Sequence, residues 1–230
     1  MSFQLDDWLG EWTSFERIIE SNDPNLRQAW NEATQAMRRK PLFALMMLGG
    51  AQRFWNKACT TSSKENLTHI GGWRIETTTQ HNQTTQPTTP TQPQTPETPG
   101  FHLTWLNTHG EPLGTFDYQL DHILEHGLEG KPCYIFHTTH QQHNNPFNVL
   151  IAMDPMPERA ALANGGLLSH MHFQYASSEE RLIKGVGENA RLKRRMWYPT
   201  MCAAEGELLD QCNIVRALHQ LPVWTALPHA

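Results

Sequence analysis

The chain has 230 residues, a length at which an antiparallel β-barrel routinely forms a single domain. Its 18 Lys and Arg residues against 23 Asp and Glu residues give a formal charge of -5, which offers no general attraction for nucleic acid or for an anionic membrane. No apolar run approaches membrane-spanning length, so we expect one domain, residues 1–230, that binds neither nucleic acid nor membrane.

The N-terminal quarter of the chain has mainly helical patterning. Trp8 and Trp12 flank Gly10, which predicts a short helix or turn that leads into a first strand. A helix is expected from about Asp23, because Asn22 or Asp23 can cap it and Pro24 suits its first turn. Apolar residues then recur at three-to-four spacing: Leu26, Ala29, Trp30, Ala33 and Met37. Pro41 ends this helix, and a second helical stretch is predicted over 42–55, interrupted by Gly49 and Gly50.

From Leu67 the apolar period becomes that of strands separated by short turns. Strands are expected over 67–75, 101–106, 113–118, 122–126, 132–137, 147–153 and 170–175. Many short strands with few helices between them favour an antiparallel barrel or sandwich over a parallel α/β sheet.

Residues 77–100 contain a tract rich in Thr, Gln and Pro. Pro87, Pro90, Pro93, Pro96 and Pro99 follow at a strict three-residue interval. This spacing favours extended polyproline II, and the tract has almost nothing apolar to bury. We expect a flexible hairpin insertion; a ligand for SH3-like grooves is the alternative.

The C-terminal part is expected to return to helices. Ser177 and Glu180 resemble a capping box and predict a helix start. Tyr198 and Pro199 indicate a loop, and 205–218 is predicted as a final amphipathic helix followed by an extended tail.

The chain has 13 histidines, and one pair has strand spacing. In a strand, residues i and i+2 point to the same face about 6.5 to 7 Å apart, so the imidazoles of His170 and His172 can converge on one ion. Neutral imidazole suits zinc, copper or nickel. Structural or surface histidines are the alternative, because a bare His-x-His pattern is not specific.

Two further sets of histidines are a loop group and a scattered set of His69, His102, His109, His122 and His126. His137, His140 and His143 lie among amides and are expected in an exposed polar loop. His122 and His126 share a strand face by parity and could reach the barrel interior. Asp117, Asp121 and Glu125 lack a defined partner in the sequence and are expected to be solvated.

No nucleophilic or phosphate-binding motif is present. The sequence has no Gly-x-Ser-x-Gly, no His-Glu-x-x-His and no Gly-x-x-x-x-Gly-Lys. Cys59, Cys133, Cys202 and Cys212 form no CxxC pair, which is typical of reduced structural thiols. The first residues lack the basic and apolar regions of a secretory signal, so we expect a cytoplasmic protein.

Taken in order, several segments resemble the ZinT family of lipocalin-like zinc-binding proteins. The resemblance starts with Leu-Asp-Asp-Trp-Leu-Gly-Glu-Trp-Thr-Ser from Leu5 and continues with Phe-Asp-Tyr from Phe116 and Tyr-Ile-Phe from Tyr134. It ends with Ser-His-Met-His from Ser169 and a Trp-Tyr-Pro loop from Trp197.

The resemblance implies a mainly β, calycin-type (lipocalin-like) antiparallel barrel with an N-terminal helical cap, C-terminal helices and a metal site near the barrel mouth. Two of the family's three zinc-binding histidines carry over to His170 and His172, and Asp154 stands in the place of the third. A carboxylate can ligate zinc at about 2.0 to 2.2 Å, so a site of two histidines and one aspartate is chemically sound. The family's disulfide positions fall here near Gly114 or Thr115 and at Thr138.

Three functions follow as hypotheses. The first is a non-catalytic protein that sequesters or delivers zinc, or a related transition metal, through His170, His172 and Asp154. The second is a lipocalin-like carrier of an apolar small molecule or haem, since a barrel of this size can enclose one ligand. The third is a metal-dependent hydrolase, for which the sequence identifies no general base.

Overall fold

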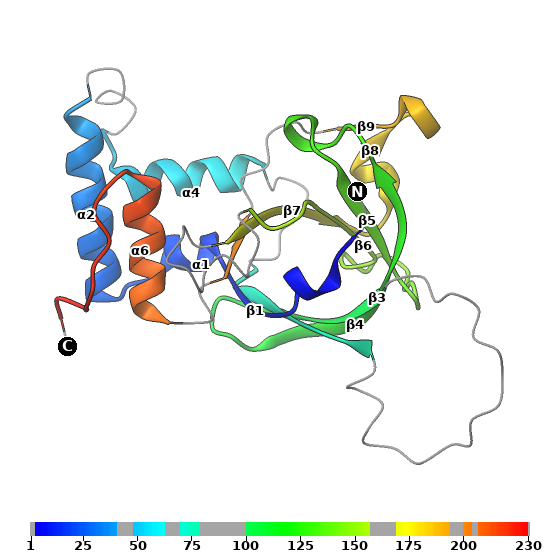
Figure 1. Ribbon diagram of the computed structural model, residues 1–230, viewed down its shortest axis with the longest axis horizontal. Helices are drawn as coiled ribbons and strands as arrows, with labels where there is room; N and C mark the ends of the chain where they lie inside the picture. The colour runs from blue at the N-terminus through cyan, green and yellow to red at the C-terminus, as the bar shows by residue number, and fades with distance from the viewer. Residues whose placement is uncertain are drawn as a thin grey trace, which may run out of the picture.

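The protein is mainly β, with a closed eight-stranded antiparallel barrel and a layer of helices beside it (Figure 1). The computed structural model describes residues 3–40, 48–62, 70–78, 100–156, 169–193, 200–203 and 207–229. The strand order around the barrel is β1-β10-β7-β6-β5-β4-β3-β2. The strands are β1 (Gly10–Ser14), β2 (Gly72–Glu76), β3 (Gly100–Leu106), β4 (Pro112–Leu124), β5 (Cys133–Thr138), β6 (Val149–Ala152), β7 (His170–Ala176) and β10 (Thr200–Cys202). The predicted fold class is therefore confirmed.

The helices gather on one side of the barrel, and a small hairpin lies on its wall. The helices are α1 (Phe15–Glu20), α2 (Pro24–Arg38), α4 (Ala51–Ser62) and α6 (Leu208–Leu218). The hairpin pairs β8 (Ile183–Lys184) with β9 (Arg191–Leu192). Short 3-10 helices complete the description: η1 (Leu5–Asp7), η3 (Leu128–Gly130), η5 (Glu179–Arg181) and η6 (Gly187–Asn189). None of the described helices is long and apolar enough to span a membrane.

Local sequence signals explain where α2 begins and which face it buries. The side chain of Asp23 accepts hydrogen bonds from the backbone N–H groups of Asn25 and Leu26, and Pro24 occupies the first turn, as predicted. The predicted stripe then buries Leu26, Ala29, Trp30 and Ala33. The second predicted stretch is seen from Ala51 onward, as α4, because 41–47 lie outside the described residues.

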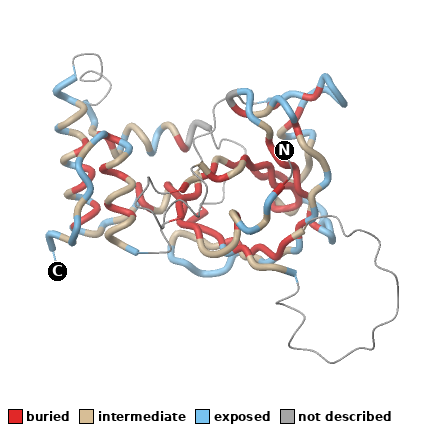
Figure 2. Tube along the Cα trace, in the orientation of Figure 1, coloured by how far each residue is buried: buried red, intermediate tan, exposed pale blue. Residues whose placement is uncertain are grey.

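Aromatic side chains fill the barrel interior. Trp73, Trp105, Phe101 and Phe136 are fully buried there, and Trp8, from the segment before β1, is equally buried against them. Much of the chain that forms the barrel is coloured as buried in Figure 2. Their ring centroids lie close together, for example 5.3 Å between Trp73 and Trp105 and 5.5 Å between Trp8 and Phe136. Such contacts stabilise the core beyond the burial of their surface. The described interior is therefore occupied by side chains.

Two expectations about the middle of the chain are wrong. The strands predicted over 113–118 and 122–126 are one strand, β4, whose register with β5 shifts between Leu120 and His122. The helix predicted from Ser177 is only the 3-10 helix η5, after which the chain forms the β8–β9 hairpin. The alternation of apolar and polar residues could not predict the bulge in β4 or the β8–β9 hairpin, because both depend on tertiary packing.

Three further expectations concern the loops and the last helix. The Thr/Gln/Pro tract joins β2 and β3, which pair as antiparallel neighbours, and 79–99 lie outside the described residues. The loop at Tyr198 and Pro199 is likewise outside them. The final predicted helix is present as α6.

His219 fixes the contact between the helices. It is 4% exposed, its Nδ1 lies 2.7 Å from the carbonyl oxygen of Val215, and its Nε2 lies 3.1 Å from the indole nitrogen of Trp55. Because an indole N–H only donates, Nε2 must accept and Nδ1 must carry the proton. Burial lowers the pKa of His219, so the ring is neutral in the folded protein.

This environment makes folding sensitive to acid. With a lowered pKa, His219 takes up a proton more readily in the unfolded chain, so its contribution to stability is lost as the pH falls below its unfolded pKa. We expect His219→Gln to cost about 1–3 kcal/mol at pH 7.5 through its altered hydrogen bonds. Urea denaturation from pH 7.5 to pH 5 should show a smaller loss of unfolding free energy in the variant than in the wild type. Equal losses would exclude a neutral, buried His219.

Candidate metal centre

His170 and His172 share one face of β7, as their spacing predicts. They alternate with Met171 and Phe173, which are buried in the barrel core, so the two histidines lie on the outer wall. Their ring centroids are 5.6 Å apart, and Nδ1 of His172 lies 2.9 Å from the hydroxyl of Thr200 on the neighbouring strand β10. The pair is therefore half-buried and already has a polar neighbour.

The structure does not bring Asp154 to this pair. Its carboxylate instead accepts a hydrogen bond of 2.8 Å from the Tyr134 hydroxyl and one of 3.4 Å from the Trp8 indole nitrogen. Both aromatic residues belong to the barrel core, whereas the histidines lie on the opposite face of the wall. Burial, together with the Asp154 carboxylate, raises the pKa of Tyr134, so the hydroxyl remains a donor. Asp154 thus fastens the N-terminal segment to the barrel.

A substitution separates this structural role from a metal-binding one. Asp154→Ala leaves the buried Trp8 and Tyr134 groups without their acceptor, so we expect a loss of about 1–3 kcal/mol of unfolding free energy. The exposed Asp6→Ala should change stability by less than about 0.5 kcal/mol. Urea denaturation of both variants measures the difference. An Asp154 variant as stable as the Asp6 variant would contradict this role.

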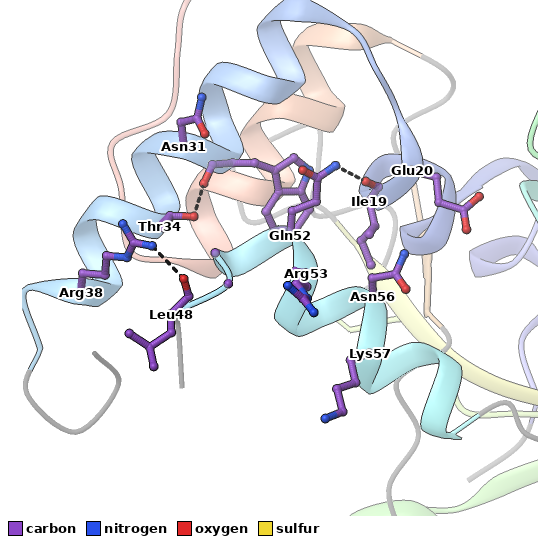
Figure 3. A pocket seen from close by; sticks show the side chains of 13 residues that line it. Ile19, Glu20, Asn31, Thr34, Arg38, Leu48, Gln52, Arg53, Asn56 and Lys57 are labelled. Carbon is purple, nitrogen blue, oxygen red and sulfur yellow. Dashed lines mark hydrogen bonds between the residues drawn. The ribbon is translucent and has the colours of Figure 1, made fainter. Parts of the chain in front are cut away.

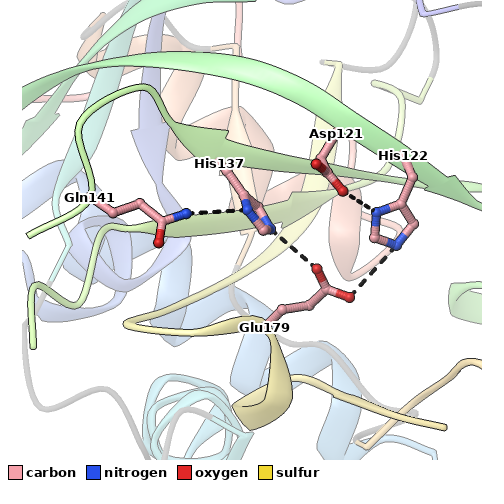
Figure 4. A network of polar contacts seen from close by, with 5 residues as sticks. All are labelled: Asp121, His122, His137, Gln141 and Glu179. Atoms are coloured by element: carbon pink, nitrogen blue, oxygen red, sulfur yellow. Dashed lines mark hydrogen bonds and ion pairs between the residues drawn. The ribbon is translucent and has the colours of Figure 1, made fainter. Parts of the chain in front are cut away.

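A different set of side chains converges on the outer wall (Figure 4). Among the described residues, one group of three His, Cys, Asp or Glu side chains places its ligand atoms within 4.8 Å of one another: Asp121, His137 and Glu179. His122 adjoins them, with its Nε2 3.7 Å from Oε1 of Glu179 and its Nδ1 2.7 Å from Oδ2 of Asp121. These four residues are called the outer-wall cluster below.

A β-bulge in β4 supplies two members of the cluster. Leu120 pairs with Phe136 and His122 with Ile135, so Asp121 is an extra residue in the ladder. Leu120 and Ile123 both pack against the barrel core although they are three positions apart. Asp121 and His122 therefore both lie on the outer side, in agreement with the frequent use of bulges to redirect side chains at functional sites.

The other two members come from β5 and η5. His137 follows Phe136, whose ring lies in the core, so its own ring faces outward. Its Nε2 lies 3.1 Å from Oε2 of Glu179, and its Nδ1 lies 3.3 Å from the side-chain nitrogen of Gln141. Glu179 is held there because the following β8–β9 hairpin packs Ile183 and Leu192 onto the apolar outer wall.

The cluster is accessible to an ion from solvent. The side chains of His137 and Glu179 are 27% and 28% exposed, and those of His122 and Asp121 are 39% and 53% exposed. Ligand atoms around a tetrahedral zinc ion lie about 3.3–3.6 Å apart at bond lengths of about 2.0–2.2 Å. The ligand atoms of Asp121, His137 and Glu179, within 4.8 Å of one another, are thus close to the spacing that a zinc ion needs.

The side chain of Gln141 lies beside Nδ1 of His137, where a metal-binding histidine needs a hydrogen-bond partner. A histidine that binds metal through Nε2 carries its proton on Nδ1 and donates it to an oxygen. Rotation of the Gln141 amide would present its oxygen to Nδ1 of His137, since amide nitrogen and oxygen are interchangeable by a flip. The donor set fits zinc or another borderline divalent metal ion.

The cysteines do not offer a competing site. All four are free and buried, as expected for reduced structural thiols. Burial raises the pKa of Cys59 and Cys202 to about 12, and that of Cys133 and Cys212 to about 11. Because the thiolate is the metal-binding form, these side chains are poor ligands at neutral pH.

Sequence patterns missed the outer-wall cluster for identifiable reasons. His122 does not point into the barrel, and His126 is exposed in a turn after β4. Asp121 does have partners, and Glu179 belongs to a 3-10 helix rather than to a longer helix. His137 is expected from the sequence both at the end of the strand 132–137 and in an exposed polar loop, and the structure places it within β5 and half-buried.

Comparison with known proteins adds no relative: no family model, no curated protein and no solved structure matches the chain.

Proposed function

We propose that this protein binds a divalent transition metal ion, with zinc as the first candidate, and acts in metal sequestration or delivery rather than in catalysis. The observation that carries the proposal is the convergence of Asp121, His137 and Glu179, from three separate elements, within 4.8 Å. His122 adjoins this group, with its Nε2 3.7 Å from Oε1 of Glu179, and we assign it as the fourth ligand. Two imidazoles and two carboxylates form a donor set that zinc accepts.

This proposal keeps the metal class indicated by the family resemblance and moves the ion to another part of the barrel wall. His170 and His172 remain a two-ligand alternative, without Asp154 as a third ligand. The alternative is that the outer-wall cluster only stabilises the fold, through the ion pairs between Glu179 and the two histidines. Ion pairs at such a partly exposed site contribute little to stability, so this alternative explains the convergence of the side chains less well.

The other two functions have less support. A carrier of an apolar ligand or haem needs space inside the barrel, and aromatic side chains occupy the described interior. A hydrolase needs a general base beside an open metal position. In the outer-wall cluster each carboxylate and imidazole is already assigned as a ligand, so we propose no catalytic step. The four free, buried cysteines are consistent with the proposed cytoplasmic location.

Zinc titration of the metal-free protein by calorimetry at pH 7.5 tests the proposal. We expect one zinc ion per chain, and at least about a hundredfold weaker binding when His137→Ala is combined with Glu179→Gln, because two of the four ligands are lost. The matched control is His140→Ala with Glu125→Gln, since both residues are exposed and lie outside the cluster. This control should bind zinc as the wild type does.

The alternative site has its own variant, His170→Ala with His172→Ala. Zinc binding that survives in this variant and disappears in the His137/Glu179 variant supports the proposal. The reverse pattern would place the metal on β7, and no saturable binding in the wild type would refute the function altogether.

A further inference from the structure

A cavity of about 900 Å³ opens between α1, α2 and α4, and its lining shares no residue with the outer-wall cluster (Figure 3). The lining combines the buried apolar side chains of Ile19 and Trp30 with exposed charged and amide side chains. Small-molecule sites occupy about 300–1,000 Å³, so the cavity has the size of a ligand site.

The charge of the lining is opposite to that of the chain. Among the described residues that line the cavity, the cations are Arg38, Arg53 and Lys57 and the one carboxylate is that of Glu20, whereas the whole chain has a formal charge of -5. A concave surface lined by one sign of charge concentrates the field and attracts ligands of the opposite sign. The lining therefore favours an anion over a cation or a neutral molecule.

Two of the cations come from the same helix. Arg53 and Lys57 are four residues apart on α4, so their side chains lie on the same helix face. A polyvalent anion beside this face would therefore meet both side chains. Gly49 leaves space for the side chain of Arg53, since a Cβ at this position would lie 2.8 Å from Cδ of Arg53.

The frame of the cavity is fixed by hydrogen bonds. The Thr34 hydroxyl accepts from the backbone N–H of Ala51 at 2.9 Å and donates to the carbonyl oxygen of Trp30 at 2.8 Å. Gln52 donates to the carbonyl oxygen of Ile19, which ties α4 to α1. Arg38 donates a hydrogen bond to the carbonyl oxygen of Leu48, which ties the end of α2 to the segment before α4. A ligand would thus enter a preformed site.

We propose that this cavity binds a small polyvalent anion, of the phosphate-ester or polycarboxylate class, through Arg53, Lys57 and Arg38. Asn31 and Asn56 also line the cavity, and their amide groups are neutral donors of the kind that suits the oxygens of such an anion. Binding here requires no metal and is independent of the function proposed for the outer-wall cluster.

Calorimetry with pyrophosphate and with citrate, on the metal-free full-length protein in low-salt buffer, tests the proposal. We expect saturable binding of at least one of the two anions, with one site per chain. Arg53→Ala combined with Lys57→Ala should weaken it at least tenfold, because two charge-assisted contacts are lost. Both residues are exposed, so the variant should fold, and circular dichroism checks this.

Two control variants distinguish binding in the cavity from a general attraction of anions to positive charge on the protein surface. Arg27→Ala removes an exposed cation from α2 that does not line the cavity, and it should bind as the wild type does. His137→Ala with Glu179→Gln should also bind normally. Pyrophosphate binding without citrate binding would identify the phosphate class, and the reverse would identify polycarboxylates. No saturable heat with either anion, or equal weakening in the Arg27 and Arg53/Lys57 variants, would overturn the proposal.

Discussion

Closure of the sheet around an aromatic core is the constraint on which the other features depend. A closed barrel leaves no exposed edge, and its interior must be filled either by side chains or by a ligand. Here Trp8, Trp73, Trp105 and their aromatic neighbours fill it. Polar chemistry is therefore placed outside the barrel, on its wall and among the helices.

The outer wall becomes a candidate metal centre through two local departures from a regular sheet. The bulge at Asp121 turns two consecutive residues of β4 outward. The apolar patch on the wall, which includes Ile135 and Ile151, binds the β8–β9 hairpin and so positions Glu179 beside His137. Neither departure creates the cluster alone, because the bulge supplies one side of it and the hairpin supplies the other.

The sequence predicted the parts of the fold that depend on local physics. The cap at Asp23, the apolar stripe of α2 and the alternation of Met171 with the flanking histidines are all local patterns, and the structure contains them. The same alternation separates an apolar face of β7 from the face of His170 and His172, but it could not predict which side chains from other strands lie beside these histidines. Asp154 was assigned to the histidine pair by resemblance, whereas the register of β6 and β7 directs it toward Trp8 and Tyr134.

The candidate site was less predictable than the fold because its members are distant in the sequence. Asp121 and Glu179 meet only after β4, β5 and η5 have been assembled, and no periodic pattern links them. The helical side presents the same difficulty, since Arg38 and Arg53 line one cavity from two separate helices.

Anomalous diffraction at the zinc absorption edge, from crystals of the zinc-loaded protein, tests the central claim most directly. The account predicts one strong peak between β4, β5 and η5, within about 2.0–2.2 Å of nitrogen atoms of His122 and His137 and carboxylate oxygens of Asp121 and Glu179. A peak on β7 beside His170 and His172, with none at the outer-wall cluster, would contradict it.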